Sequence, residues 1–174
     1  MKTTLTSLSL VGAIALSAPA LANDSTTDPA SAASSPAQQC RTERSKMGVE
    51  VFRSTYGTNH NKHNAFGKCV SKRAHATEDA AADARTNASK ECTAAGKHGA
   101  NAHGKCVSEK AKAKTAATVA EQVDADVNAA KACKALRNAD PDGFADTYGT
   151  NANKRNAFGK CVSKLAKSQE DDDS

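Results

Sequence analysis

The sequence of 174 residues has no Trp, two Tyr, four Phe and six Cys. After the first 22 residues it also has no Ile, and its large apolar side chains are eight Val, four Phe, two Leu and one Met. Burial of so few groups hardly offsets a conformational entropy of roughly 1–2 kcal/mol per residue, so another source of stability is needed. The length suits one modest domain or a few small modules and excludes a two-domain enzyme.

The first 22 residues have the pattern of a secretory signal peptide. Lys2 is followed by a mostly apolar, uncharged stretch from Leu5 to Leu16, and then by the small-x-small sequence Ala20-Leu21-Ala22. The stretch is too short to cross a bilayer and ends at a processing site. We predict cleavage after Ala22 and a mature protein that is secreted, either extracellular or in the cell envelope. No later apolar run is long enough to be a transmembrane segment.

The chain contains a duplication. Residues 56–72 read YGTNHNKHNAFGKCVSK and residues 148–164 read YGTNANKRNAFGKCVSK, identical at all but two positions. The aromatic residues fall in matched pairs in the two copies: Phe52 and Phe144, Tyr56 and Tyr148, Phe66 and Phe158. A truncated third copy, residues 101–108, lies between them without the Tyr-Gly-Thr-Asn portion. Repeats of this kind indicate one recurring structural unit.

The repeat suggests how the cysteines pair. Six cysteines allow fifteen pairings, and export to an oxidising space favours disulfides. If each copy is a unit, the pairs are Cys40–Cys69, Cys92–Cys106 and Cys133–Cys161. Ligation of a metal by the thiolates is the weaker alternative, because zinc sites use closely spaced ligands and the nearest cysteines here are fourteen residues apart.

The segments between the repeats predict helices. Residues 71–92 and 107–136 are rich in Ala, Lys, Glu and Arg and contain neither Pro nor Gly. Small apolar residues recur at helical spacing in two stripes. They are Ala76, Ala80, Ala84 and Ala88, then Ala113, Ala116, Ala120, Val123, Val127 and Ala130.

The fold class expected is all-α: an up-and-down array of about four Ala-rich helices, joined by three disulfide-stapled helix–loop–helix corners that alternate between its two ends. The helical repeat domain spans residues 38–169, with corner units 40–72, 92–108 and 133–164. A disordered leader (23–37) precedes it and an acidic tail (170–174) follows.

Local signals predict the helix ends. Gly57 and Gly149 should follow helices that end at Tyr56 and Tyr148, and Asn64, Asn101 and Asn156 should be N-caps. Gly67, Gly104 and Gly159 each precede a Cys by two residues, in a first helical turn where Gly destabilises. We attribute them to close approach of the partner helix across the disulfide, with flexibility as the alternative.

The motif NAFGKCVSK preceded by a Tyr-Gly-Thr-Asn loop resembles secreted bacterial proteins of actinobacterial type that carry such repeats. The resemblance covers roughly residues 40–167 and departs at the truncated middle copy. It implies export and assigns no activity.

The charge of the predicted domain is strongly positive. All 23 basic residues after position 22 lie between Arg41 and Lys167, with 13 acidic residues in the same span, which gives 23 − 13 = +10. Such a body outside the cell can bind a polyanion, such as extracellular nucleic acid or an anionic wall polymer. The simpler interpretation, which we prefer, is that lysines solubilise Ala-rich helices.

The corner loops are the candidate recognition residues: Asn59, Asn61, Lys62, Asn151, Asn153 and Lys154. Amide and ammonium groups near a helix N-terminus can hold a phosphate, a carboxylate or a sugar. Asn and Gly also satisfy turn geometry without any ligand, and this is the preferred explanation.

Metal sites and catalysis are not expected. The histidines (His60, His63, His75, His98 and His103) are interpreted as surface residues, and the first two become Ala152 and Arg155 in the other copy. Asp140-Pro141-Asp142-Gly143 fits an N-cap followed by Pro at N1 better than a calcium loop. If all six cysteines pair, no thiol is left as a nucleophile, and no hydrolase or nucleotide motif occurs. The small apolar complement argues against an enclosed pocket of several hundred Å³.

The function expected is therefore that of a non-enzymatic, disulfide-stabilised repeat protein, an extracellular or envelope interaction or structural module without a cofactor. The alternative is a basic polyanion-binding protein.

Overall fold

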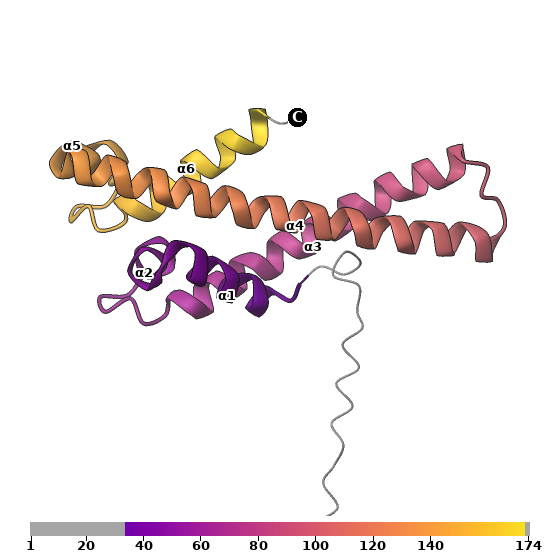
Figure 1. Cartoon of the computed structure of the whole chain (residues 1–174), viewed down its shortest axis with the longest axis horizontal. Helices are drawn as coiled ribbons and strands as arrows, with labels where there is room; N and C mark the ends of the chain where they lie inside the picture. The colour runs from indigo at the N-terminus through magenta and orange to yellow at the C-terminus, as the bar shows by residue number, and fades with distance from the viewer. Residues whose placement is uncertain (1–33, 173–174) are drawn as a thin grey trace, which may run out of the picture.

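The computed structural model describes residues 34–172, and all regular secondary structure in this range is α-helical (Figure 1). The helices are α1 (Pro36–Met47), α2 (Val49–Tyr56), α3 (Ala65–Ala94), α4 (Ala100–Ala139), α5 (Pro141–Tyr148) and α6 (Ala157–Asp172). The all-α class is confirmed. The predicted signal peptide and most of the leader lie outside the described residues.

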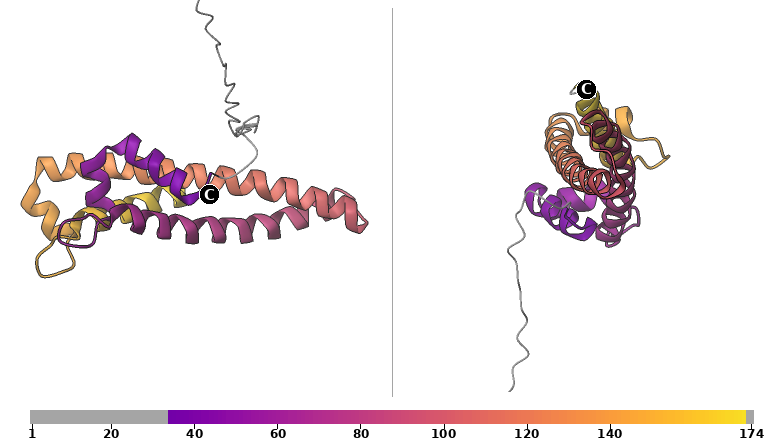
Figure 2. Two further views of the ribbon diagram at one scale, coloured as in Figure 1. Left: turned by 90° about the horizontal axis from the view of Figure 1, so that it is seen from below. Right: turned by 90° about the vertical axis from the view of Figure 1, so that its right-hand side faces the viewer.

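The long helices α3 and α4 form an antiparallel hairpin that runs the length of the molecule (Figure 1). At 1.5 Å per residue the 40 residues of α4 extend about 60 Å. Helices α1, α2, α5 and α6 pack around one end of this hairpin, and the far half of the hairpin stands alone (Figure 2). The first and last corner units are thus side by side, although they are far apart in the sequence.

Residues 34–172 form six helices where about four were expected, because the chain breaks once between α1 and α2 and once between α4 and α5. Gly48 has φ 84° and ψ 156°, which ends α1 and lets α2 start at the next residue. Asp140 ends α4 and caps α5, where its carboxylate accepts a hydrogen bond from Gly143 N at 3.0 Å. Pro141 follows at N1. The N-cap interpretation of this segment is confirmed.

Several predicted boundaries were wrong. Helix α1 begins inside the supposed leader, because Ser35 and Gln38 form a reciprocal capping box and Pro36 occupies N1. Helix α6 continues through the first three residues of the predicted acidic tail. Asn101 lies inside α4, whose N-cap is Gly99 with φ 97°. Asn64 does occupy an N-cap position, but its side chain makes no capping hydrogen bond.

Three disulfides connect the corners, and they are the pairs expected from the repeat: Cys40–Cys69, Cys92–Cys106 and Cys133–Cys161. The middle bridge closes the free end of the hairpin, whereas the other two lie in the packed end. The bridges thus alternate along the chain between the two ends of the array.

The hydrophobic core is confined to the packed end of the molecule. It contains Cys40, Cys69, Cys133 and Cys161 together with the aromatic residues of both copies. The rings of Phe52 and Tyr56 pack in a tilted arrangement with centroids 5.0 Å apart, and Phe144 and Tyr148 repeat this pair at the same distance. The duplication therefore builds the same aromatic cluster twice in one core.

The free half of the hairpin is held by small residues. Ala84, Ala88 and Ala111 form a separate minor cluster with Val107 against it. Glu91 adds surface ion pairs across the hairpin, to Lys110 at 2.9 Å and to Lys114 at 2.8 Å. Little area is buried per contact here, so the middle disulfide provides much of the constraint.

The predicted stripe is correct on α3 and partly wrong on α4. Ala80, Ala84 and Ala88 are buried on α3. On α4 the buried face starts at Ala111, Thr115 and Val119, whereas Ala113 and Ala120 are exposed. A threonine was not expected in the stripe, but its hydroxyl donates a hydrogen bond to Ala111 O at 2.8 Å.

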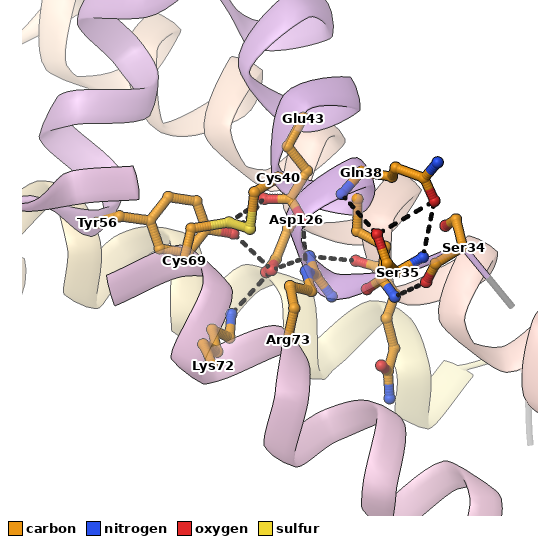
Figure 3. Close-up of a disulfide and its surroundings, with 12 residues drawn as sticks. Ser34, Ser35, Gln38, Cys40, Glu43, Tyr56, Cys69, Lys72, Arg73 and Asp126 are labelled. Atoms are coloured by element: carbon orange, nitrogen blue, oxygen red, sulfur yellow. Dashed lines mark hydrogen bonds and ion pairs between the residues drawn. A yellow bond between two sulfur atoms is a disulfide. The ribbon is translucent and has the colours of Figure 1, made fainter. Parts of the chain in front are cut away.

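A buried ionic network lies beside the Cys40–Cys69 bridge (Figure 3). The Arg73 guanidinium donates hydrogen bonds to the carboxylate of Glu43 and, at 2.6 Å, to that of Asp126. The Tyr56 hydroxyl donates its hydrogen bond to Glu43 and lies 3.2 Å from the Asp126 carboxylate. Glu43, Arg73 and Asp126 are each at most 3% exposed. Burial raises the pKa of Glu43, although the positive charge of Arg73 opposes this shift.

The last corner unit lacks this ion pair. By the repeat alignment, Leu136 stands where the first unit has Glu43, and Leu165 stands where it has Arg73. Both members of the pair are exchanged together for leucines, but Leu136 is 45% exposed and Leu165 is half-buried, so the last unit does not bury this pair as the first unit does. A buried pair is often replaceable by packed apolar residues, whereas a single lost partner leaves an unpaired buried charge.

We predict that removing a disulfide destabilises the domain according to the loop that it closes. The variant Cys92→Ala/Cys106→Ala, in which the sequence separation is 14, should lose about 3 kcal/mol. The variant Cys40→Ala/Cys69→Ala, with a separation of 29, should lose about 3.5 kcal/mol or more, because its sulfurs also pack in the core. Urea unfolding followed by circular dichroism measures both losses. Unchanged unfolding midpoints would contradict the prediction.

A second prediction uses the exchange between the two copies. Arg73→Leu alone should lower the free energy of unfolding by about 3–5 kcal/mol, because Glu43 remains buried without a cation. The double variant Glu43→Leu/Arg73→Leu should recover at least half of this loss, since it leaves no unpaired Glu43 carboxylate in the core and Asp126 keeps Lys72 at 2.8 Å. A double-mutant cycle measured by urea unfolding tests the coupling. Additive losses would refute it.

Candidate functional site: the cleft between the two repeat loops

The two repeat loops, residues 57–64 and 149–156, have the same internal structure. In the first loop, Asn64 Oδ1 accepts a hydrogen bond from Thr58 N at 3.1 Å, and Asn64 Nδ2 donates to Thr58 Oγ1 at 2.7 Å. Asn156 and Thr150 repeat both bonds in the second loop, at 3.1 and 2.6 Å. The predicted capping asparagines thus bond back across their loops. This clamp holds each loop in a defined shape.

Each loop contains a lysine in the left-handed backbone region. Lys62 has φ 56° and Lys154 has φ 54°, and they are the non-glycine residues with positive φ among residues 34–172. A left-handed conformation is unfavourable for a lysine. Both copies nevertheless keep Lys rather than Gly or Asn at this position.

The preceding glycines serve close packing. Gly57 and Gly149 do follow the helix ends at Tyr56 and Tyr148, as predicted, but their φ values of −73° and −78° are open to any residue. A Cβ atom on Gly57 would lie 2.5 Å from Lys62 Cβ and 2.6 Å from the Arg53 carbonyl oxygen. The chain can turn back this tightly only where the side chain is missing.

The two loops project from the same end of the molecule and lie beside each other (Figures 1 and 2). Between them is an open cleft of about 580 Å³, the interloop cleft. One wall is the end of α2 and the first loop, from Ser54 to Lys62. The other is the second loop and the start of α6, from Asn151 to Ser163. The cleft is open rather than enclosed, and two loops rather than a large core form its walls.

Four of the six predicted recognition residues line the interloop cleft: Asn59, Lys62, Asn151 and Asn153. Asn153 Oδ1 also accepts a hydrogen bond within its own loop, from Arg155 N at 3.2 Å. The other two predicted residues do not line the cleft, and among residues 34–172 they bond only within their own repeat. Asn61 Oδ1 accepts a hydrogen bond from His63 N at 3.1 Å. Lys154 Nζ donates to Gly149 O at 3.2 Å and lies 3.7 Å from Asp146.

Lys62 and Lys154 differ in their ion pairing because of one residue earlier in each repeat. Asp146, beside Lys154, corresponds by the repeat alignment to Ser54 in the first copy. Lys62 therefore lacks the carboxylate that its counterpart has. Together with Arg155 and Lys160, it contributes positive charge to the interloop cleft, and none of the three forms an ion pair within the described residues.

Arg155 and Lys160 were missed in the sequence. In the sequence, Arg155 stands out only because the first copy has His63 at the same position. Lys160 is a lysine that both copies have at the start of a helix. Nothing in the sequence placed these two residues opposite the first loop. That information lies in the packing of α6 against α2.

The positive charges in the interloop cleft affect one another. Burial lowers the pKa of Lys62, and the nearby charges of Arg137 and Arg155 lower it further. No carboxylate lines the cleft in the part of the chain that the structure describes. The cleft is therefore a site at which a negative charge would be stabilised.

The α2–α6 contact depends on one glycine. A Cβ on Gly159 would lie 2.9 Å from the carbonyl oxygen of Thr55. A Cβ on Gly67, its counterpart on α3, or on Gly104 of α4 would have no neighbouring atom within 4 Å. The interpretation that these glycines allow close approach of the disulfide-bonded helix was thus wrong for all three. Gly67 and Gly104 have no such neighbour, and Gly159 contacts α2, whereas the nearby Cys161 is bonded to Cys133 on α4.

The histidines do not assemble a metal site. His60 borders the interloop cleft, and His63, His75 and His98 are exposed. Among residues 34–172 no three side chains of His, Cys, Asp or Glu are grouped for metal binding. Over the same residues, no helix combines the length and the apolar character required to cross a bilayer.

Comparison of the chain with protein families, with curated proteins and with solved structures finds no match. A functional assignment therefore depends on the geometry and chemistry of the interloop cleft.

The matched glycines provide a prediction with an internal control. Gly159→Ala should lower the free energy of unfolding by about 1–2 kcal/mol, because α6 must move away from the Thr55 carbonyl. Gly67→Ala, in the same local sequence, should raise it by about 0.5–1 kcal/mol, because an open helical glycine gains helix propensity. Thermal and urea unfolding of the two variants measure the difference. Equal effects of both substitutions would show that α2 and α6 are not in close contact.

Proposed function

We propose that the protein is a non-enzymatic binding module of the extracellular space or cell envelope, and that it holds an anionic partner in the interloop cleft. The observation that carries the proposal is the convergence of the two repeat loops on a cleft with three cations and no lining carboxylate. The sequence led to two expected functions, an interaction module with an unspecified partner and a polyanion-binding protein. The geometry supports a combination of the two, an interaction module whose partner is anionic.

The strained lysines support a role in binding. A residue held in an unfavourable backbone region is retained where the surrounding structure imposes it, often at a functional site. At Lys62 the strain is accompanied by charge repulsion, since Arg137 and Arg155 help to lower its pKa. A bound anion would relieve the repulsion among these three side chains.

The composition of the interloop cleft supports binding over catalysis. Its lining includes hydroxyl, amide and cationic groups and one imidazole, that of His60. General acid–base or nucleophilic chemistry needs a second group that activates the first. No such pair is formed by the residues that line the cleft.

Export is supported by the covalent structure. The described residues contain three disulfides and no free cysteine. Disulfides persist in oxidising compartments outside the cytoplasm. This agrees with the signal peptide predicted for residues 1–22.

The proposal predicts binding of inorganic phosphate to the interloop cleft. Titration followed by NMR should shift the amide signals of both loops. Lys62→Gln/Arg155→Gln should weaken binding by about 10-fold or more, because two cations are lost. Binding should also weaken as the pH rises through the lowered pKa of Lys62, since a neutral amine no longer attracts the anion.

The control is a variant of equal charge away from the interloop cleft, Lys90→Gln/Lys131→Gln, in which both lysines are exposed and in no ion pair among the described residues. It should keep the phosphate affinity of the unaltered protein. Equal losses in the two double variants would mean that general surface charge, rather than the cleft, binds the anion.

A further inference from the structure

Two smaller cavities adjoin the interloop cleft, and each shares a wall residue with it. A cavity of about 190 Å³ is lined by Arg44 and Arg53 and shares Lys62 with the cleft. A cavity of about 170 Å³ is lined by Lys167 and shares Ser163 with the cleft. We name these three neighbouring hollows the anion track.

The anion track is positive throughout. Its principal cations are Arg44, Arg53, Lys62, Arg155, Lys160 and Lys167. The carboxylate that borders it, Asp126, is buried and already bonded to Arg73 at 2.6 Å and to Lys72 at 2.8 Å. Arg53 has only a long, exposed pair with Glu50 at 3.5 Å, and such pairs are weak.

We infer that the anion track binds an extended phosphodiester chain, and that this chain is a poly(polyol phosphate) rather than a nucleic acid. The inference rests on the proposed function, because the interloop cleft is the centre of the track. It adds the length of the ligand and its chemical class.

The inferred length of the ligand follows from the distribution of the cations along the anion track. A single phosphate in the interloop cleft occupies the hollow lined by Lys62, Arg155 and Lys160, whereas the outer cavities place further cations next to Lys62 and Ser163. Linked anionic groups that occupy successive hollows bind together, because after the first contact the others become intramolecular. Arg and Lys neutralise phosphates along a chain in this way.

The preference for a polyol follows from the side chains that are available. Proteins that bind single-stranded nucleic acid stack the bases on exposed aromatic rings. Here Phe52 and Phe66 line the outer cavity beside Lys62, but Phe52 is buried and Phe66 is half-buried against the core. In the described part of the chain, no phenyl or phenol ring lines the interloop cleft at the centre of the track, so no row of exposed rings is available there for stacking. In place of rings, the interloop cleft has polar side chains that form no hydrogen bond among the described residues, and these can bond to polyol hydroxyls. They are Ser54, Asn59, Asn151 and Ser163.

The experiment measures the affinity of the full mature chain for glycerol phosphate and for oligo(glycerol phosphate) of three and six units by calorimetry at one salt concentration. The six-unit chain should bind about 100-fold more tightly than glycerol phosphate. A thymidine hexanucleotide should bind at least about 10-fold more weakly than the six-unit chain.

Matched variants locate the contacts. Arg53→Gln/Lys167→Gln, at the two outer cavities, should weaken binding of the six-unit chain about 10-fold and change that of glycerol phosphate less than about two-fold. Arg155→Gln, in the centre, should weaken both ligands. Lys90→Gln/Lys131→Gln should change neither, and circular dichroism confirms that each variant is folded.

Each outcome decides between the two proposals. Equal affinity for one and six units would overturn the anion track and leave the interloop cleft as an anion site. Binding of the hexanucleotide as tight as that of the six-unit chain would overturn the polyol assignment. No binding of any phosphate compound would overturn both this inference and the proposed function.

Discussion

The local disulfides are the constraint on which the rest of the structure depends. Each bridge joins two helices of one corner, with separations of 14 to 29 residues, so every corner is closed within its own repeat. Because the corners are closed covalently, the chain needs only one modest core, at the end where two corner units meet. The far half of the hairpin can then consist of alanines and surface ion pairs around the middle bridge.

The duplication produced two similar corner units, and the substitutions between the copies make their side-chain environments different. The first unit buries an ionic network, whereas the corresponding positions of the last unit are Leu136, which is largely exposed, and the half-buried Leu165. The same loop carries a lysine paired with Asp146 in one copy and an unpaired lysine, Lys62, in the other. The units also pack unequally, since Gly159 meets α2 whereas Gly67 meets nothing. The interloop cleft arises from this inequality.

The chemistry of the interloop cleft explains why rigid loops matter. Positive side chains that repel one another remain close only if the backbone holds them there. The Asn–Thr clamp in each loop and the glycine at each helix end provide that rigidity without a large core. A site of this kind is already organised for an anion before the anion arrives, so little ordering is needed on binding.

Features that arise from local rules and from the repeat could be predicted from the sequence. Helix-forming composition, the glycine and proline positions and the matched copies predicted an all-α array with one disulfide in each corner. Four residues of the cleft were also predictable, because Asn and Lys in a glycine-flanked loop are candidates in any fold. The break at Gly48 and the capping box at Ser35 were not anticipated, although both have local sequence causes.

Only the tertiary structure determines which surfaces of the helices come into contact. Glu43, Arg73 and Asp126 come from three different helices, so no spacing in the sequence indicates that they share a buried network. In the same way, Arg155 lies opposite Lys62 only because α6 packs on α2, through a glycine whose exact copy on α3 has no neighbour. Identical segments acquired different surroundings, because long-range packing depends on the whole chain and local sequence does not encode it.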